Sequence, residues 1–120
     1  MLIAHGSPDP DWRRPLEALR DQLAARIGAK RISLAYLAHP PTVEDAIASL
    51  VAAGETQICV IPALLSPGGK HVKRDIPEAV TRAHARFPTI LLRLVPGALG
   101  SDSRVISALA EASLDLRKSR

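Results

Sequence analysis

The feature that most constrains the fold is a fourfold alternation of short apolar runs with longer amphipathic segments. The apolar runs have the length and composition of buried strands, and they cover residues 1–4, 32–37, 58–61 and 90–95. In the segments that follow, apolar residues recur every three or four positions, as on one face of a helix; these segments cover residues 10–27, 43–53, 77–86 and 102–116. Strands that alternate with helices predict parallel pairing through right-handed crossovers.

This alternation predicts an α/β fold in which helices cover both faces of a four-stranded parallel sheet. For a doubly wound sheet we expect the strand order 2-1-3-4, with the topological switch point between the first and third strands. The chain has 120 residues, which suits a single domain over 1–120. No linker, internal repeat or low-complexity segment interrupts the sequence.

Capping and turn residues mark the ends of the helices. Thr42 is expected to cap the second helix, with Asp45 in the capping-box position, and Asp75 is expected to cap the third. Gly28 supplies a stop for the first helix, and Pro15 is expected in its first turn, where a missing N–H costs little. The apolar face of the last helix comprises Val105, Ile106, Leu109, Ala112 and Leu116.

Composition excludes several classes of function. With 47% apolar and 23% charged residues the chain is not disordered, and its 2% of aromatic residues argues against a platform that stacks single-stranded nucleic acid. The net charge of +4 suits an acidic partner without identifying it. No apolar run approaches the ~20 residues of a membrane span, and the single Cys59 favours a reducing compartment. We therefore expect a cytoplasmic protein that binds neither nucleic acid nor membranes.

Three of the four histidines follow expected strands at one edge of the sheet. His5 follows the first strand, His39 the second, and His71 lies in the loop after the third. Ligands of open α/β sheets bind at this carboxyl edge. Because adjacent strands are ~4.8 Å apart, side chains from the loops after the first and third strands can converge on one small ion. Such a histidine can be a metal ligand, a general base, a phosphoryl acceptor or an imidazole bonded to a loop carbonyl. His84 falls within the third helix and is expected to be a surface or packing residue.

The loop after the third strand combines glycines with positive charge. Around His71 it contains Gly68, Gly69, Lys70, Lys73 and Arg74. The two glycines suit a flexible or positive-φ turn, and cations ahead of a helix N-terminus suit an anion. The spacing is not that of a Walker loop, and a solvated surface loop is the alternative. In the loop after the first strand, Ser7 lacks the surroundings of a hydrolase nucleophile.

Two sequence blocks resemble the class II tetrapyrrole chelatases. Residues 5–12, HGSPDPDW, resemble the H-G-S-R-D-P opening of that family. Residues 61–77, IPALLSPGGKHVKRDIP, are similar to its second block, V-x-P-x-F-L-x-x-G-x-H-x-x-x-D-[IL]-P. The blocks have the family's order and separation, the similarity covers nearly the whole chain, and the pattern is that of the short CbiX-like sirohydrochlorin cobaltochelatases.

The resemblance implies a chelatase-like fold and the insertion of a divalent metal, Co²⁺ or in relatives Fe²⁺ or Ni²⁺, into the anionic tetrapyrrole sirohydrochlorin. The metal is a substrate, and no organic cofactor is implied. The two histidines of the family correspond to His5 and His71, which would bind the metal and accept the pyrrole protons. Near-neutral imidazoles suit a site that must strip a hydrated cation and hold it weakly. The resemblance also implies a homodimer, with the substrate between two copies.

The same resemblance suggests which residues contact the tetrapyrrole. Cations beside the histidines can hold the carboxylates at its rim, and Arg14 is one of them. The other candidate contacts are Ser7, Arg13, Gly68, Gly69, Lys70, Lys73 and Arg74.

One position departs from the family pattern. Ala38 stands where the family usually has an acidic residue after the second strand. Either His39 substitutes there as a metal ligand or base, or the site is weakened and the chain is a non-catalytic carrier of metal or tetrapyrrole. Phosphoryl transfer of the phosphoglycerate-mutase type is disfavoured, because Ala4 stands where those enzymes have an arginine.

Overall fold

The computed structural model describes residues 1–66, 69 and 71–118, with the side chains of 71 and 72 left out of the description. The elements along the chain are β1 (Leu2–Ala4), α1 (Pro10–Ile27), η1 (Ala29–Arg31), β2 (Leu34–Tyr36), α2 (Val43–Ala52), β3 (Gln57–Pro62), η2 (His71–Asp75), α3 (Ile76–Arg86), β4 (Leu91–Leu94), η3 (Leu99–Ser101) and α4 (Ser103–Arg117). All strand pairs are parallel and the order is β2-β1-β3-β4, so the predicted fold class is confirmed.

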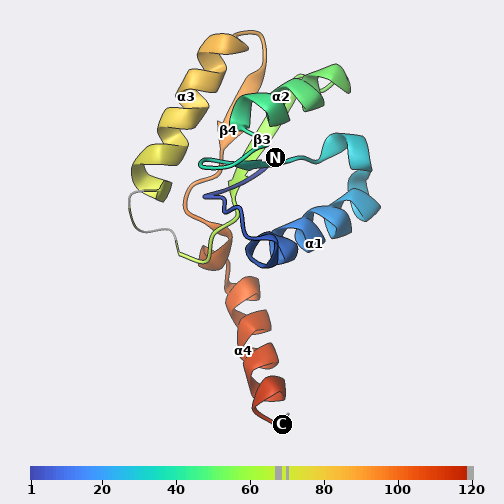
Figure 1. The fold of residues 1–120 in the computed structure, drawn as a ribbon, viewed down its shortest axis with the longest axis vertical. Helices are drawn as coiled ribbons and strands as arrows, with labels where there is room; N and C mark the ends of the chain where they lie inside the picture. The colour runs from blue at the N-terminus through green and yellow to red at the C-terminus, as the bar shows by residue number, and fades with distance from the viewer. Residues whose placement is uncertain (67–68, 70, 119–120) are drawn as a thin grey trace.

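Helices cover the two faces of this sheet unequally (Figure 1). Because successive side chains of a strand point to opposite faces, Ile3 packs with α2 and α3 on one side. Leu2 and Ala4 pack against α1 on the other. The α2 and α3 side spans the sheet and includes β3 residues such as Val60. The α1 side is built mainly over β1 and β2, which leaves part of β3 and β4 without a helix above them.

Some of the residues predicted to begin or end helices do so in the structure, and others do not. The capping box of α2 is confirmed: the Asp45 N–H donates to Thr42 Oγ1 and the Thr42 N–H donates to an Asp45 carboxylate oxygen, both at 3.2 Å. Gly28 ends α1 with φ of 100°. Pro15 is the sixth residue of α1, so the prediction that it lies in the first turn was wrong. Asp75 was wrongly predicted as a cap, because its own φ and ψ are helical and its side chain makes no capping bond among the described residues.

Removing the capping side chain tests this account of α2. We expect Thr42→Ala to lower the free energy of unfolding by about 1 kcal/mol, the usual cost of losing an N-cap. Thr81→Ala is the matched control, since its hydroxyl donates to the Pro77 carbonyl within α3. Thermal melts followed by circular dichroism measure both, and equal shifts for the two variants would contradict a specific capping role.

The last helix departs from the expected packing. The apolar face predicted for α4 exists in sequence, but none of its residues is buried. The helix extends away from the body of the molecule, and its main contacts are to the η3 turn that precedes it (Figure 1). Local periodicity predicted the helix correctly but gave no information on which surface it covers.

Candidate functional site

The loops after β1 and β2 are joined at the carboxyl edge of the sheet. The Ala38 N–H donates to the His5 carbonyl at 2.7 Å, and the Leu37 N–H donates to the Ala4 carbonyl at 3.0 Å. Gly6 is buried between the loops with φ of +103°, and a Cβ added there would lie 2.8 Å from Tyr36 Cβ. These contacts join the loops after β1 and β2, and glycine is required at the point where they touch. The predicted convergence of side chains from the loops after β1 and β3 depends on the His71 side chain, which lies outside the described residues, so it stays a prediction.

The half-buried His5 ring is oriented by its own loop. Its Nδ1 lies 3.0 Å from the Gly6 carbonyl oxygen. A carbonyl can only accept, so Nδ1 carries the proton and a neutral ring has its lone pair on Nε2. Metal-binding histidines commonly donate one ring N–H to a carbonyl in this way, which fixes the tautomer and orients the other nitrogen. The geometry of His5 thus suits a ligand or a proton acceptor that uses Nε2.

His5 lines a hollow of about 230 Å³ that contains two carboxylates and one guanidinium. The other lining residues are Leu37, Ala38, Asp75, Glu78 and Arg82. Glu78 also lies 3.4 Å from Arg74 Nε as an exposed ion pair. Glu78 and Arg82 were not among the residues predicted from the sequence. Their positions three and seven residues after Asp75 could have indicated them, since this spacing places all three on one helical face directly after the loop at this edge.

His39 lies in a different hollow. Its Nε2 accepts from Arg13 Nη1 at 3.1 Å, and its Nδ1 donates to the Pro40 carbonyl at 2.6 Å. Its ring meets that of Tyr36 edge-on at 5.9 Å, and burial raises the pKa of the Tyr36 phenol. This hollow has about 270 Å³ and also contains Glu17. Both ring nitrogens of His39 therefore have protein partners, and the structure does not bring His39 into the hollow of His5.

The remaining residues singled out in sequence have varied surroundings. Ser7 Oγ accepts from the Asp9 N–H at 3.1 Å, and the Ser7 carbonyl accepts from Arg13 at 3.4 Å, so both stabilise the entry to α1. Gly69 has the expected positive φ, 85°. Lys73 and Arg74 are exposed just ahead of α3.

Other predicted residues lie outside the described part of the chain. Gly68 and Lys70 are among them, and so is the side chain of His71. The backbone of His71 begins η2, four residues before Asp75. Among the described side chains, no three of His, Cys, Asp or Glu lie close enough to hold a metal ion. The metal-binding roles of His5, His39 and His71 therefore stay predictions.

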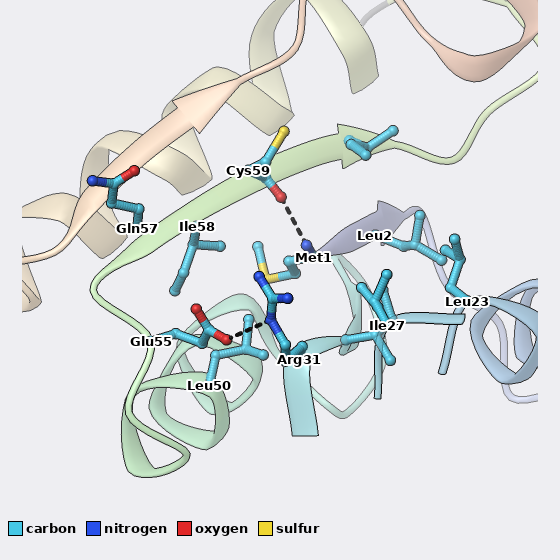
Figure 2. A pocket seen from close by; sticks show the side chains of 12 residues that line it. Met1, Leu2, Leu23, Ile27, Arg31, Leu50, Glu55, Gln57, Ile58 and Cys59 are labelled. Atoms are coloured by element: carbon cyan, nitrogen blue, oxygen red, sulfur yellow. Dashed lines mark hydrogen bonds and ion pairs between the residues drawn. The ribbon is translucent and has the colours of Figure 1, made fainter. Parts of the chain in front are cut away.

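A second kind of pocket lies at the opposite, amino-terminal end of the strands (Figure 2). It has about 240 Å³ and is lined largely by apolar side chains such as Leu23 and Ile27. Several of its polar groups bond to each other: the Met1 amino group donates to the Cys59 carbonyl at 2.7 Å, and Arg31 pairs with Glu55 at 3.1 Å. No histidine is among the described residues that line it, and we do not assign the function to it.

The known proteins to which this chain is similar include metal chelatases. The CbiX family model matches residues 1–116. A sirohydrochlorin ferrochelatase of Bacillus subtilis (strain 168) is 29% identical over 97% of this chain, which spans 44% of that protein. A sirohydrochlorin cobaltochelatase of Sulfolobus acidocaldarius is 26% identical over 92% of this chain and 85% of that protein. The chain thus spans less than half of the Bacillus relative and most of the archaeal one.

The solved structures to which this chain is similar are also CbiX and sirohydrochlorin chelatase proteins. A cobalamin (vitamin B12) biosynthesis CbiX protein from Marinobacter aquaeolei VT8 superposes with a TM-score of 0.81 and 25% identity, over 98% of this chain and 93% of that one. The sirohydrochlorin chelatase SirB from Bacillus subtilis subspecies spizizenii, in complex with cobalt, gives 0.79 and 30%, over 95% of this chain and 48% of that one. No helix in the described residues is long and apolar enough to span a membrane. With its family model matched over almost the whole chain, this protein belongs to the CbiX family.

Proposed function

We propose that this protein inserts a divalent metal ion into sirohydrochlorin, with Co²⁺ as the metal substrate. The observation that carries the proposal is His5, whose Nδ1 is bonded to the Gly6 carbonyl so that the lone pair is on Nε2, next to the carboxylates of Asp75 and Glu78. Membership of the CbiX family supports a chelatase. Cobalt is supported by the cobaltochelatase of Sulfolobus acidocaldarius, most of whose length this chain spans.

The reaction exchanges two N–H bonds for metal–nitrogen bonds. The ion must lose water, reach the plane of the macrocycle, and displace two pyrrole protons while its charge of +2 enters the ring. An imidazole nitrogen binds first-row divalent metals and can also accept a proton near neutral pH. We assign these steps to His5 and His71. Each imidazole would carry out metal binding and proton uptake one after the other. A ring nitrogen that has released the metal can take up a pyrrole proton.

We assign supporting roles to the charged and polar residues around His5 and His71. Asp75 and Glu78 attract the cation to the hollow of His5. Lys73 and Arg74, exposed ahead of α3, are placed to hold rim carboxylates of the tetrapyrrole together with Lys70. Arg13 orients His39, and Ser7 holds the start of α1, so that both support the loop that carries His5. The functional unit in this proposal is a cytoplasmic homodimer, with the macrocycle between two copies.

Substitution of Glu78 tests the role of the carboxylates. We expect Glu78→Gln to raise the KM for Co²⁺ about fivefold with little change in kcat, because charges a few ångströms apart in water interact by ~1 kcal/mol. Glu17→Gln removes the same charge from the His39 hollow and is the matched control. Initial rates at varied Co²⁺ measure the effect. Equal changes in the KM for Co²⁺ in the two variants would contradict a local role of Glu78. They would indicate that only the net charge of the protein affects the KM.

The direct test of the function is the absorbance change of sirohydrochlorin when purified protein and Co²⁺ are added, with the uncatalysed rate subtracted. We expect turnover with Co²⁺, and parallel assays with Fe²⁺ and Ni²⁺ rank the metals. Ala38, which lines the hollow of His5, motivates the competing hypothesis of a carrier. Tight binding of metal or tetrapyrrole with no acceleration of insertion would support the carrier and contradict the chelatase.

A further inference from the structure

The His39 hollow contains polar groups that the steps of metal insertion do not use. It has about 270 Å³ and lies between α1 and the edge strand β2. The charged and hydrogen-bonding side chains that line it are Arg13, Glu17, Arg20, Tyr36 and His39. The loop after β2 separates it from the hollow of His5, since residues 37–38 line the hollow of His5 and residues 39–41 line this one.

Tyr36 gives the clearest indication of a ligand in the His39 hollow. The residue is only 4% exposed, yet no described residue bonds its phenol oxygen. Every fully buried side-chain nitrogen or oxygen among the described residues has a partner, so the phenol oxygen is open to the hollow that Tyr36 lines. An almost buried polar group costs free energy when it is unsatisfied. We expect the missing partner to come from what fills the hollow.

The ring of Tyr36 is held in place by its neighbours. It meets the Trp12 ring at 6.1 Å between centroids and the His39 ring edge-on at 5.9 Å, and the Tyr36 N–H donates to the Pro41 carbonyl at 2.9 Å. Burial raises the pKa of the phenol, and the Glu17 carboxylate raises it further, so the group stays protonated near neutral pH. The hollow therefore contains a positioned hydroxyl donor, which suits a ligand with an acceptor atom.

The charge of the His39 hollow favours an anion. Two guanidiniums, of Arg13 and Arg20, and one carboxylate, of Glu17, line it from α1, which leaves the lining with a net charge of +1. The described hydrogen-bond partners of Arg13 are a backbone carbonyl and His39 Nε2, both uncharged acceptors. Arg20 also pairs with Asp21 at 3.1 Å on the exposed side of the helix. A ligand that carries negative charge can therefore add a partner for Arg13 and Arg20.

A carboxylate on a larger molecule fits the His39 hollow better than a free inorganic anion. The apolar side chains of Leu34, Pro40 and Pro41 form part of the lining and suit the carbon atoms that carry such a carboxylate. Its two oxygens can accept from a guanidinium and from the phenol at the same time. Tyr36 is the last residue of β2, so the rest of the molecule can extend over the carboxyl edge of the sheet. Of the substrates in the proposed function, the tetrapyrrole has this chemistry.

We propose that the His39 hollow binds a rim carboxylate of the tetrapyrrole, with Tyr36 Oη and the Arg20 guanidinium as donors. The inference rests on the proposed function and adds the place at which the macrocycle is anchored. A carboxylate held on the α1 side of the loop after β2 leaves the centre of the ring over the carboxyl edge, toward His5 on the other side of that loop. The cations ahead of α3 then remain for the opposite rim.

Quenching of Trp12 fluorescence measures tetrapyrrole binding without metal and without turnover. Trp12 is the only tryptophan, and its ring lies 6.1 Å from that of Tyr36. We expect Tyr36→Phe to raise the Kd for metal-free sirohydrochlorin about tenfold, as for the loss of one hydrogen bond to a charged group. Its melting temperature should not fall, because the hydroxyl bonds no described residue.

The charged donor is tested in the same assay. Arg20→Gln should raise the Kd for metal-free sirohydrochlorin by a similar factor of about ten. Arg26→Gln removes the same charge from an exposed position of α1 and is the matched control, with an expected change within about twofold. Equal Kd values for wild type, Tyr36→Phe and Arg20→Gln would overturn the proposal.

Two further arms separate a rim carboxylate from other occupants of the hollow. With sirohydrochlorin whose carboxylates are methyl esters, the difference in Kd between wild type and Tyr36→Phe should largely disappear, because a neutral ester is a weaker acceptor than a carboxylate. A difference that persists with the ester would contradict the proposal. Inorganic phosphate, added at constant ionic strength, should leave the tetrapyrrole Kd of wild type unchanged. Competition by phosphate that Tyr36→Phe abolishes would indicate a site for free anions and overturn the proposal.

These measurements are independent of the chelatase assay. Turnover with Co²⁺ together with unchanged Kd values in Tyr36→Phe and Arg20→Gln would overturn only the anchoring of the macrocycle. The expected changes in Kd without metal insertion would support the anchoring and contradict only the proposed chelatase activity.

Discussion

His5→Ala is expected to lower the rate of metal insertion into sirohydrochlorin by about 100-fold or more, because under the proposed mechanism the variant loses both a metal ligand and a proton acceptor. Circular dichroism should show a fold close to wild type, since His5 is only half-buried and follows the end of β1. The variant should also bind Co²⁺ more weakly in a titration without tetrapyrrole. His71→Ala is expected to act in the same direction.

Two other histidines provide controls for this result. His84 is exposed on α3, and His84→Ala should retain the wild-type rate. His39 is held by Arg13 and by the Pro40 carbonyl, so we expect His39→Ala to lower the rate much less than His5→Ala. A loss as large at His39 as at His5 would indicate that His39 ligates the metal after all. An unchanged rate in His5→Ala would refute the assignment of the site.

Gly6→Ala is expected to lower the free energy of unfolding by about 3 kcal/mol. The φ of +103° is unfavourable for any residue with a side chain, and the new Cβ would lie 2.8 Å from Tyr36 Cβ and 3.0 Å from His39 Cβ. For a domain of this size the melting temperature should fall by more than about 10 °C. Insertion activity should fall as well, because the displaced loop carries His5 and the carbonyl that orients it.

Gly54→Ala separates the two causes of this loss. Gly54 has a similar φ of +96°, but a Cβ there would meet nothing within 4 Å. We therefore expect about 1 kcal/mol from backbone strain alone and no loss of activity. If Gly6→Ala and Gly54→Ala were equally stable and equally active, close contact of the two loops would not be what fixes the site.

The sheet could be predicted from the sequence because its determinants are local and repeated. Four apolar runs alternate with amphipathic helices, and the handedness of crossovers then leaves few possible strand orders. The capping box at Thr42 was equally readable, since both partners lie within one turn. Pro15 and Asp75 were misplaced because helix boundaries depend on the packing of the whole helix as well as on the residues at its ends.

The site was only partly predictable for a different reason. Chain order places His5 and His39 at one edge, but which side of that edge each ring takes depends on contacts such as that of Arg13 with His39. Glu78 was overlooked because an exposed carboxylate on a helix is common, and only the folded chain shows that it lines the hollow of His5. The apolar face of α4 likewise predicts burial, but periodicity does not identify the surface that would bury it.

A crystal structure of the protein soaked with Co²⁺ would test the central claim most directly. We predict one ion at the carboxyl edge of the sheet, within about 2.2 Å of His5 Nε2 and of an imidazole nitrogen of His71. His39 should still be bonded to Arg13. An ion bound by His39 with Arg13 displaced, or a site at this edge that stays empty at saturating Co²⁺, would contradict the account.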